Sequence, residues 1–110
     1  MADPAVVELA DRIRALLGGD GEIEERAMFG SRAFLNDGRI LVGARRGGTL
    51  LVRVTAERAA VLLTEPGVSQ AVMGARTMSE NWLDVAPEAV ADDAALMGWI
   101  DVAREVAEGV

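Results

Sequence analysis

The sequence of 110 residues lacks cysteine, histidine, lysine and tyrosine altogether. Without cysteine it has no disulfide, no thiolate nucleophile and no thiolate metal ligand. Without histidine it lacks the commonest general base and metal ligand, and without lysine neither a Schiff base nor a P-loop is available. These absences exclude most familiar enzyme chemistry, so we predict a non-enzymatic protein with no cofactor and no transition-metal site.

The residues that remain for chemistry have structural explanations. Ser31, Ser69 and Ser79 have no histidine or lysine to activate a hydroxyl nucleophile. Asp92 and Asp93 form the densest acidic pair of the C-terminal part, but a helical pattern follows them, and carboxylates stabilise the positive end of a helix dipole. We therefore predict no catalytic residues and no metal ligands.

Charge is distributed unevenly along the chain. Eighteen acidic residues against 11 arginines give a net charge of -7, which opposes binding to duplex DNA because that affinity comes largely from phosphate neutralisation. Residues 26–58 nevertheless hold seven arginines and only two acids, between acidic segments on either side. This basic stretch indicates either solvated strand faces that balance acidic helices or a site for an anionic partner.

Length and hydropathy point to one compact unit. A chain of 110 residues has the usual size of one domain, and 51% hydrophobic residues are enough for a packed core. No apolar run approaches the roughly 18 residues of a membrane span, and the N-terminus lacks the pattern of a signal peptide. We expect a single domain over residues 1–110, located in the cytoplasm and without a membrane partner.

Three segments show the spacing of amphipathic helices, with apolar residues recurring every three or four positions. The first is expected to begin at Pro4 behind an Asp3 cap and to end at Gly18, which tolerates the left-handed conformation. The second is expected to follow a Thr55 cap, and the third an Asp92 cap. All three should bury one apolar stripe.

The segment over residues 23–54 alternates between apolar and polar positions as strands do. Asp37 and Gly38 are a strong signal for a two-residue hairpin turn, and a three-residue loop at 46–48 keeps the next two strands in register. Two less regular strands are expected within residues 70–85. Segregated strands with short hairpins predict an α+β fold with two layers: an antiparallel sheet of five to six strands and about three helices, mainly on one face.

The register assigns side chains to the two faces of this sheet. The face under the helices is expected to hold Leu35, Ile40, Val42, Leu50, Val52 and Val54. The two-residue turn places Phe34 opposite Leu41 on the other face, beside Leu51 and Arg53 and with Trp82 from a later strand. These side chains are too apolar for a solvated face. We predict that these five residues form an interface with a protein partner or with a second copy of the chain.

Short motifs in the middle and late parts of the chain form a further pattern. They comprise Arg26, Met28, Phe29 and Gly30, then the turn at 37–38, then Gly74, Arg76 and Met78, and finally Leu96 and Trp99. In these residues the chain resembles the N-terminal domain of the TfoX/Sxy family of bacterial competence regulators, over about residues 22–108. Family domains usually carry a second glycine after Met-Phe-Gly, where this chain has Ser31.

The resemblance implies a two-layer fold with an antiparallel sheet and supplies no catalytic residues. Longer family members continue into a domain that resembles helix-hairpin-helix nucleic-acid modules, and we expect this chain to be a stand-alone copy of the first domain. The leading hypothesis is a regulatory domain that acts through protein contacts. The alternative is a domain that binds a small anionic ligand with arginines of residues 26–58. An enzyme that uses only carboxylates and arginine is the third.

Overall fold

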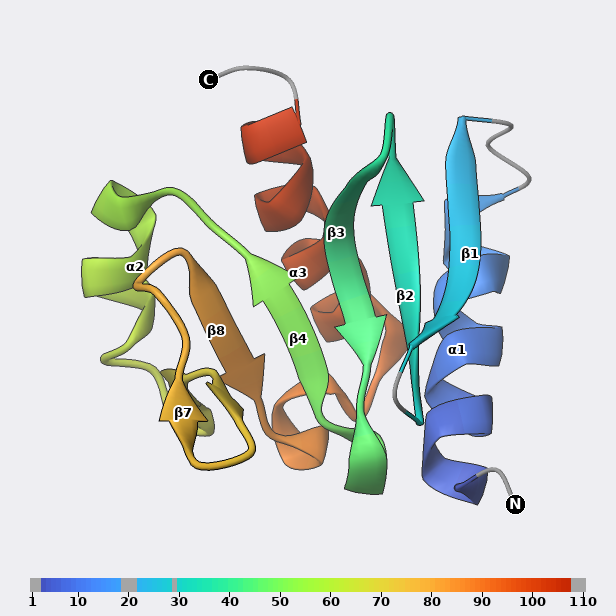
Figure 1. Ribbon diagram of the computed structural model, residues 1–110, viewed down its shortest axis with the longest axis horizontal. Coiled ribbons are helices and arrows are strands. Elements are labelled where there is room, and N and C mark those ends of the chain that lie inside the picture. Colours follow the sequence, from blue (N-terminus) through green and yellow to red (C-terminus); the bar gives the residue numbers. More distant parts are fainter. Residues whose placement is uncertain (1–2, 19–21, 29, 108–110) are drawn as a thin grey trace.

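The computed structural model describes residues 3–18, 22–28 and 30–107 (Figure 1). The helices are α1 (Pro4–Leu17), α2 (Ala56–Leu62) and α3 (Asp93–Ala107), with short 3-10 turns at Arg46–Gly48 and Pro87–Val90. The strands are β1 (Ile23–Met28), β2 (Ser31–Asn36), β3 (Arg39–Ala44), β4 (Leu50–Arg53), β5 (Val68–Gln70), β6 (Val72–Met73), β7 (Arg76–Thr77) and β8 (Trp82–Val85). No helix in these described ranges is long and apolar enough to cross a membrane.

The predicted helix caps are confirmed. The Asp3 carboxylate accepts a hydrogen bond from the Ala5 amide at 2.9 Å, and Gly18 ends α1 in the left-handed conformation with φ 65°. The Thr55 hydroxyl accepts from the third residue beyond it, and the Asp92 carboxylate does the same at the start of α3. Each cap satisfies an amide that the first helical turn leaves without a partner.

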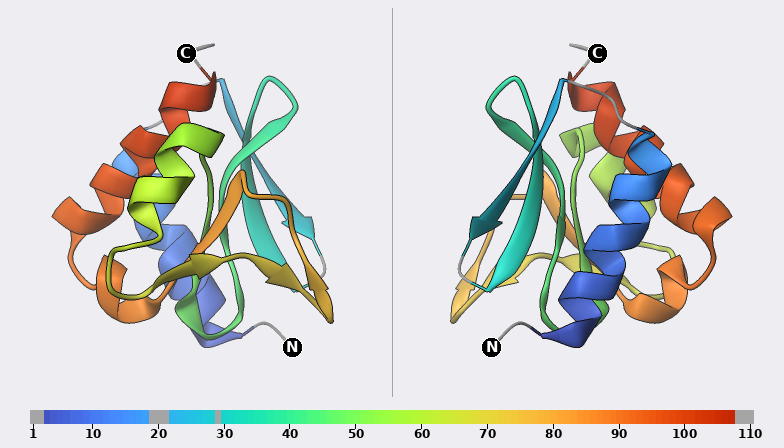
Figure 2. Two further views of the ribbon diagram at one scale, coloured as in Figure 1. Left: turned by 90° about the vertical axis from the view of Figure 1, so that its left-hand side faces the viewer. Right: turned by 90° about the vertical axis from the view of Figure 1, so that its right-hand side faces the viewer.

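Six strands form one antiparallel sheet in the order β1-β2-β3-β4-β8-β5, and β6 and β7 form a separate two-stranded hairpin. All three helices cover the same face of the large sheet, whereas the β6–β7 hairpin projects from the opposite side, which we call the outer face (Figures 1 and 2). The α+β class with a two-layer antiparallel arrangement is thereby confirmed. The core lies between the sheet and the helices.

The registers of the two hairpins differ in how well the turn chemistry predicts them. The three-residue loop between β3 and β4 pairs Ala44 with Leu50, as expected. The turn between β2 and β3 also forms as expected at its tip, but the ladder then shifts by one residue, so that Phe34 pairs with Val42. Leu41 is the extra residue of this β-bulge.

The bulge changes which side chains face the helices. Phe34 is only 2% exposed and packs in the helix-side core together with Leu41 and Val42. Leu41 and Val42 are adjacent in sequence, so strict alternation would place them on opposite faces of the sheet. Because of the bulge, both side chains are buried on the helix side. The prediction that Phe34 and Leu41 lie on the outer face is therefore wrong. The prediction that Leu35 and Ile40 face the helices is wrong for the same reason, since they pair with each other on the outer side.

Candidate functional site

A groove with a volume of about 600 Å³ runs along the outer face, between strands of the large sheet and the β6–β7 hairpin. Its apolar lining consists of Met28, Ala33, Ile40, Leu51, Val72 and Met73. Leu51 is only 8% exposed, whereas Val72 and Met73 on β6 are 42% and 53% exposed. Two neighbouring exposed apolar side chains beside an apolar floor are typical of a binding surface.

Gly43 leaves the floor of the groove open. It pairs with Leu51 on the neighbouring strand, and a Cβ atom at Gly43 would lie 3.6 Å from the Leu51 Cβ, which is an ordinary contact. The backbone there does not require glycine. The missing side chain therefore adds space to the groove and relieves no clash.

A single arginine anchors the hairpin that forms one wall of the groove. The Arg45 guanidinium donates to both carboxylate oxygens of Asp84, at 2.9 and 3.1 Å, and to the Val72 carbonyl at 2.7 Å. Both side chains of this ion pair are about four-fifths buried. A partly buried charged pair with several hydrogen bonds fixes geometry well. The groove is therefore held in shape before any partner arrives.

The rim of the groove has one arginine that is not in an ion pair, Arg46. Arg45 and Asp84, which also line the groove, neutralise each other, and Arg32 contacts Glu25 at 3.3 Å on the helix side of the sheet. Arg46 has no described carboxylate within 4.0 Å, and its guanidinium lies 3.6 Å from where a Cβ of Gly30 would be. Hydrogen bonds from the Gly47 and Ala5 amides and the charge of Arg46 lower the pKa of Asp3, so Arg46 lies near this one carboxylate. An apolar floor with a positive rim suits an apolar segment that carries acidic side chains.

A comparison with models of protein families shows to which family this chain belongs. The family model of the TfoX N-terminal domain matches residues 15–107. This chain belongs to the TfoX N-terminal domain family. Membership supports a regulatory kind of role and speaks against an enzyme. No curated protein and no solved structure matches the chain.

The family motifs of this TfoX N-terminal domain meet at the groove, although they are far apart in sequence. Met28 at the end of β1 and Gly74 in the β6–β7 turn both line it. Gly30 has φ 82° and lies beside Arg46 at the rim, and Phe29 lies outside the described residues. The motif around Met28 and the motif around Gly74 therefore build opposite parts of one surface.

The other motif residues have structural contacts. Arg26 is exposed and pairs with Glu24 at 2.7 Å on the same strand. The Met78 carbonyl accepts a hydrogen bond from the Gln70 side chain at 2.7 Å, which ties the segment after β7 to β5. Arg76 is exposed on β7 and has no carboxylate partner among the described residues. These contacts shape the surroundings of the hairpin.

The structure divides the predicted interface residues among three places. Leu51 lines the groove, whereas Phe34 and Leu41 belong to the helix-side core. Arg53 and Trp82 pair across β4 and β8, and the Arg53 guanidinium lies 5.7 Å from the centre of the Trp82 ring. The groove residues Val72 and Met73 were missed, whereas Met28 was identified only as a motif residue. The available signal was an apolar pair directly before a glycine at residues 72–74.

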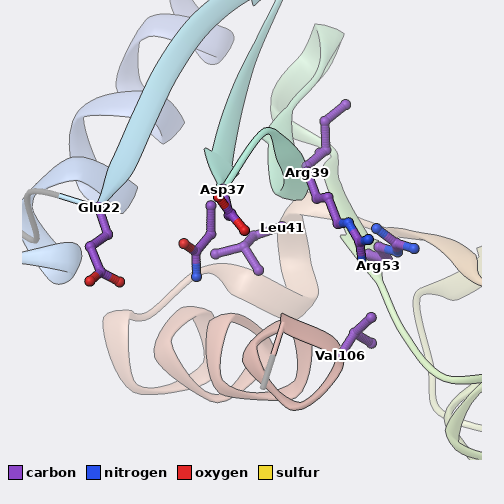
Figure 3. Close-up of a pocket in the computed structure, with 8 residues that line it drawn as sticks. Glu22, Asp37, Arg39, Leu41, Arg53 and Val106 are labelled. Atoms are coloured by element: carbon purple, nitrogen blue, oxygen red, sulfur yellow. The ribbon is translucent and has the colours of Figure 1, made fainter. Parts of the chain in front are cut away.

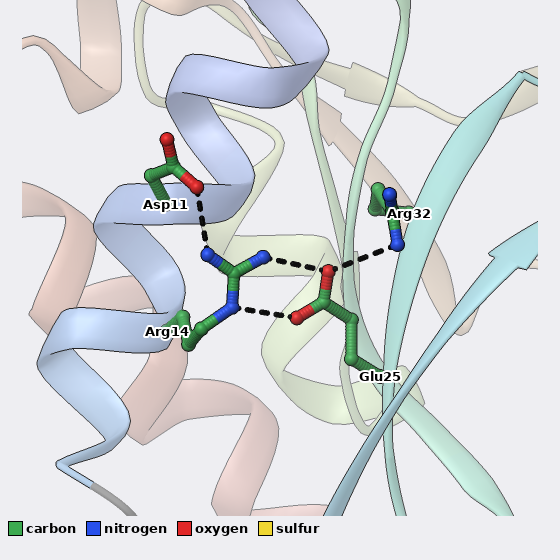
Figure 4. A network of polar contacts seen from close by, with 4 residues as sticks. All are labelled: Asp11, Arg14, Glu25 and Arg32. Atoms are coloured by element: carbon green, nitrogen blue, oxygen red, sulfur yellow. Dashed lines mark hydrogen bonds and ion pairs between the residues drawn. The ribbon is translucent and has the colours of Figure 1, made fainter.

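A polar network on the helix side ties the edge strand β1 to α1 (Figure 4). The Arg14 guanidinium donates two hydrogen bonds of 2.8 Å to the Glu25 carboxylate and one of 2.7 Å to Asp11, and Arg32 approaches Glu25 from β2. Arg14 holds the pKa of Glu25 below its ordinary value, and Glu25 raises the pKa of Arg14. This network stabilises the fold, since every member has a charged partner.

The acidic side chains do not gather into a metal site. Within the described residues, no three carboxylates lie close enough together to hold a metal ion. Asp92 caps α3, and its neighbour Asp93 pairs with Arg12 at 3.0 Å. The groove on the outer face offers apolar side chains together with guanidinium groups.

Proposed function

We propose that this TfoX N-terminal domain is a regulatory domain that binds a segment of a protein partner in the groove of the outer face. The observation that carries the proposal is the apolar groove of about 600 Å³ in which Val72 and Met73 remain exposed beside the covered floor at Leu51. Apolar side chains that enter such a groove supply most of the binding free energy at protein interfaces.

The charges around the groove indicate the chemistry of the partner segment. Arg45 is neutralised by Asp84, whereas Arg46 forms no ion pair within the described residues and interacts with the Asp3 carboxylate only at longer range, in a protein whose net charge is -7. A segment with one or two large apolar side chains and flanking acidic residues complements this rim, and the acidic remainder of the domain repels it elsewhere. The proposed occupant is therefore an acidic, apolar segment of another protein.

A photo-reactive amino acid at position 73 tests the proposal in cells that express the full chain. The matched control places the same group at Val61, which is 67% exposed on α2 and lies on the other side of the molecule. We expect one protein to cross-link from position 73 and not from position 61. The same products from both positions, or none from position 73, would overturn the proposal.

Binding of the purified cross-linked partner then measures the energetic role of the groove. Because Met73 is exposed, Met73→Asp should leave the fold intact and weaken binding by about 1–3 kcal/mol, whereas Val61→Asp should leave the affinity unchanged. Equal affinities of both variants contradict the proposal. A dimer of the domain that light scattering detects, and that Met73→Asp dissociates, would assign the groove to a second copy and reject a different protein as its occupant.

A further inference from the structure

A second cavity, of about 700 Å³, lies between the β2–β3 turn and the C-terminal part of α3 (Figure 3). The residues that matter for its chemistry are Glu22, Asp37, Arg39, Leu41, Arg53 and Val106. Among the residues that the structure describes, it shares only Ile40 with the lining of the groove. Its function can therefore be tested separately from that of the groove.

The two arginines of this cavity, unlike most other arginines of the chain, do not pair with a described carboxylate. Arg12, Arg14, Arg26, Arg32, Arg45 and Arg58 each lie within 4.0 Å of a carboxylate. Arg39 and Arg53 have no ion pair and no hydrogen bond to a described residue, although the chain has 18 acidic residues. In the described part of the chain, these two arginines thus line one cavity without forming an ion pair, although Asp37 and Glu22 line the same cavity. Their guanidinium groups therefore offer hydrogen-bond donors to an anion.

The fold brings these two side chains together from neighbouring strands. Arg39 begins β3 and Arg53 ends β4, and Figure 3 shows their guanidinium groups on the same side of the cavity. The ring of Trp82 faces the Arg53 guanidinium at 5.7 Å, which restricts where that group points. The two positive charges repel each other because the fold holds them close together, and an anion bound between them would offset this repulsion.

The rest of the lining limits the size and the charge of a ligand. Leu41 and Val106 contribute apolar surface, and Asp37 and Glu22 place carboxylates across the cavity from the arginines (Figure 3). These acids disfavour a polyanion such as a nucleic acid, because additional negative charge would face them. The lining therefore suits a ligand with one anionic group, which would contact the arginines, and a small remainder that is neutral or donates hydrogen bonds, which would face the carboxylates.

We propose that this cavity binds a small molecule through one carboxylate or phosphate group, which the guanidinium groups of Arg39 and Arg53 hold together. Arginine matches both groups because its planar N–H donors form paired hydrogen bonds to two oxygens. The two sources of the anionic group, a carboxylic acid or a phosphate ester, share this recognition chemistry. The proposal is independent of the groove and of its protein partner.

Nuclear magnetic resonance titration of the full chain tests this site directly. The probes are lactate, glycerol phosphate and inorganic phosphate, each compared with sodium chloride at the same ionic strength. We expect saturable shifts of the backbone amides of Asn36, Arg39 and Val106, which line the cavity. Saturation by lactate alone assigns a carboxylate, and saturation by the phosphates alone assigns a phosphate; both results support the site.

Variants show whether the arginines cause the binding. Arg39→Gln should weaken the binding of the saturating probe at least tenfold, and Arg53→Gln should do the same. Arg76→Gln is the matched control, because Arg76 is also exposed and without a described carboxylate partner but lies on β7, away from the cavity. The proposal is overturned if every probe shifts the spectrum no more than sodium chloride does, or if Arg76→Gln weakens binding as much as Arg39→Gln.

Discussion

On the helix side of the sheet, Phe34 and Val42 are almost completely buried, whereas on the outer face Val72 and Met73 keep about half of their surface in water. Both faces are apolar, but the three helices cover the helix side, whereas the short β6–β7 hairpin on the outer face leaves its own apolar side chains exposed. The helix side therefore stabilises the fold, and the groove side offers apolar surface to another molecule. Changes on the two faces should separate stability from binding.

The largest expected difference between the faces concerns a fully buried side chain of the helix side, Phe34, and an exposed one of the outer face, Met73. Phe34→Ala should lower the free energy of unfolding by about 3–5 kcal/mol, because it leaves a cavity in the helix-side core. Met73→Ala on the outer face should change it by less than about 0.5 kcal/mol, because that side chain is exposed. Urea denaturation followed by circular dichroism measures both values. Equal losses for the two variants would remove the distinction between the faces.

The next effect concerns the anchor that holds the groove open. Arg45→Gln should lower the free energy of unfolding by about 2 kcal/mol, because it removes hydrogen bonds from a partly buried guanidinium to Asp84 and to the Val72 carbonyl. Hydrogen exchange should accelerate most over residues 72–77, since the hairpin loses its tie to the sheet. Arg26→Gln, which removes an exposed pair with Glu24, should cost less than about 0.5 kcal/mol. Uniform exchange changes across the sheet would contradict the anchoring role.

Local signals explain which parts of the fold were predictable. A cap such as Asp3 or Thr55 acts on amides two or three residues away, and the turn at Asp37 and Gly38 depends on residues that adopt positive φ. These interactions lie within a few positions of the sequence. The starts of the helices, the tip of the first hairpin and the loop at 46–48 were therefore predicted correctly, whereas α2 ends at Leu62, about two residues earlier than expected.

The candidate site depended on features that no local pattern contains. The bulge at Leu41 arises because Phe34, Leu41 and Val42 all pack against helices that are distant in sequence. The groove requires the short strands β6 and β7, whose two residues each are too few to show alternation. The Arg45–Asp84 pair joins residues 39 positions apart. The sequence placed Leu51 on the correct face of the sheet, but the groove that surrounds Leu51 was not predictable.

The acid dependence of stability tests the polar tie on the helix side. The pKa of Glu25 in the folded state lies below its ordinary value of 4.5, so its contribution is complete above that pH and is lost as the pH falls through the folded-state pKa. Glu25→Gln should therefore cost about 1 kcal/mol at pH 7 and progressively less below pH 4.5. Urea denaturation at a series of pH values measures this, with Glu24→Gln on the same strand as the control. A cost that stays constant with pH would exclude the charged form of Glu25 as its cause.

The substitution with the smallest expected effect on stability, Gly43→Ala, should change stability and partner binding in opposite directions. Gly43→Ala should stabilise the fold slightly, by about 0.5 kcal/mol, because glycine inside a strand loses more conformational entropy on folding than alanine. The added methyl group would make ordinary contacts of 3.6 Å with Leu51 and with the Arg32 carbonyl, so the backbone has no reason to move. The same methyl group occupies the floor of the groove and should weaken partner binding by about 1 kcal/mol.

The control is Gly98→Ala, at an exposed helical position with open space around it. This substitution should stabilise the fold without changing the affinity for the partner. If Gly43→Ala and Gly98→Ala leave the affinity equally unchanged, the partner does not reach the floor at Leu51.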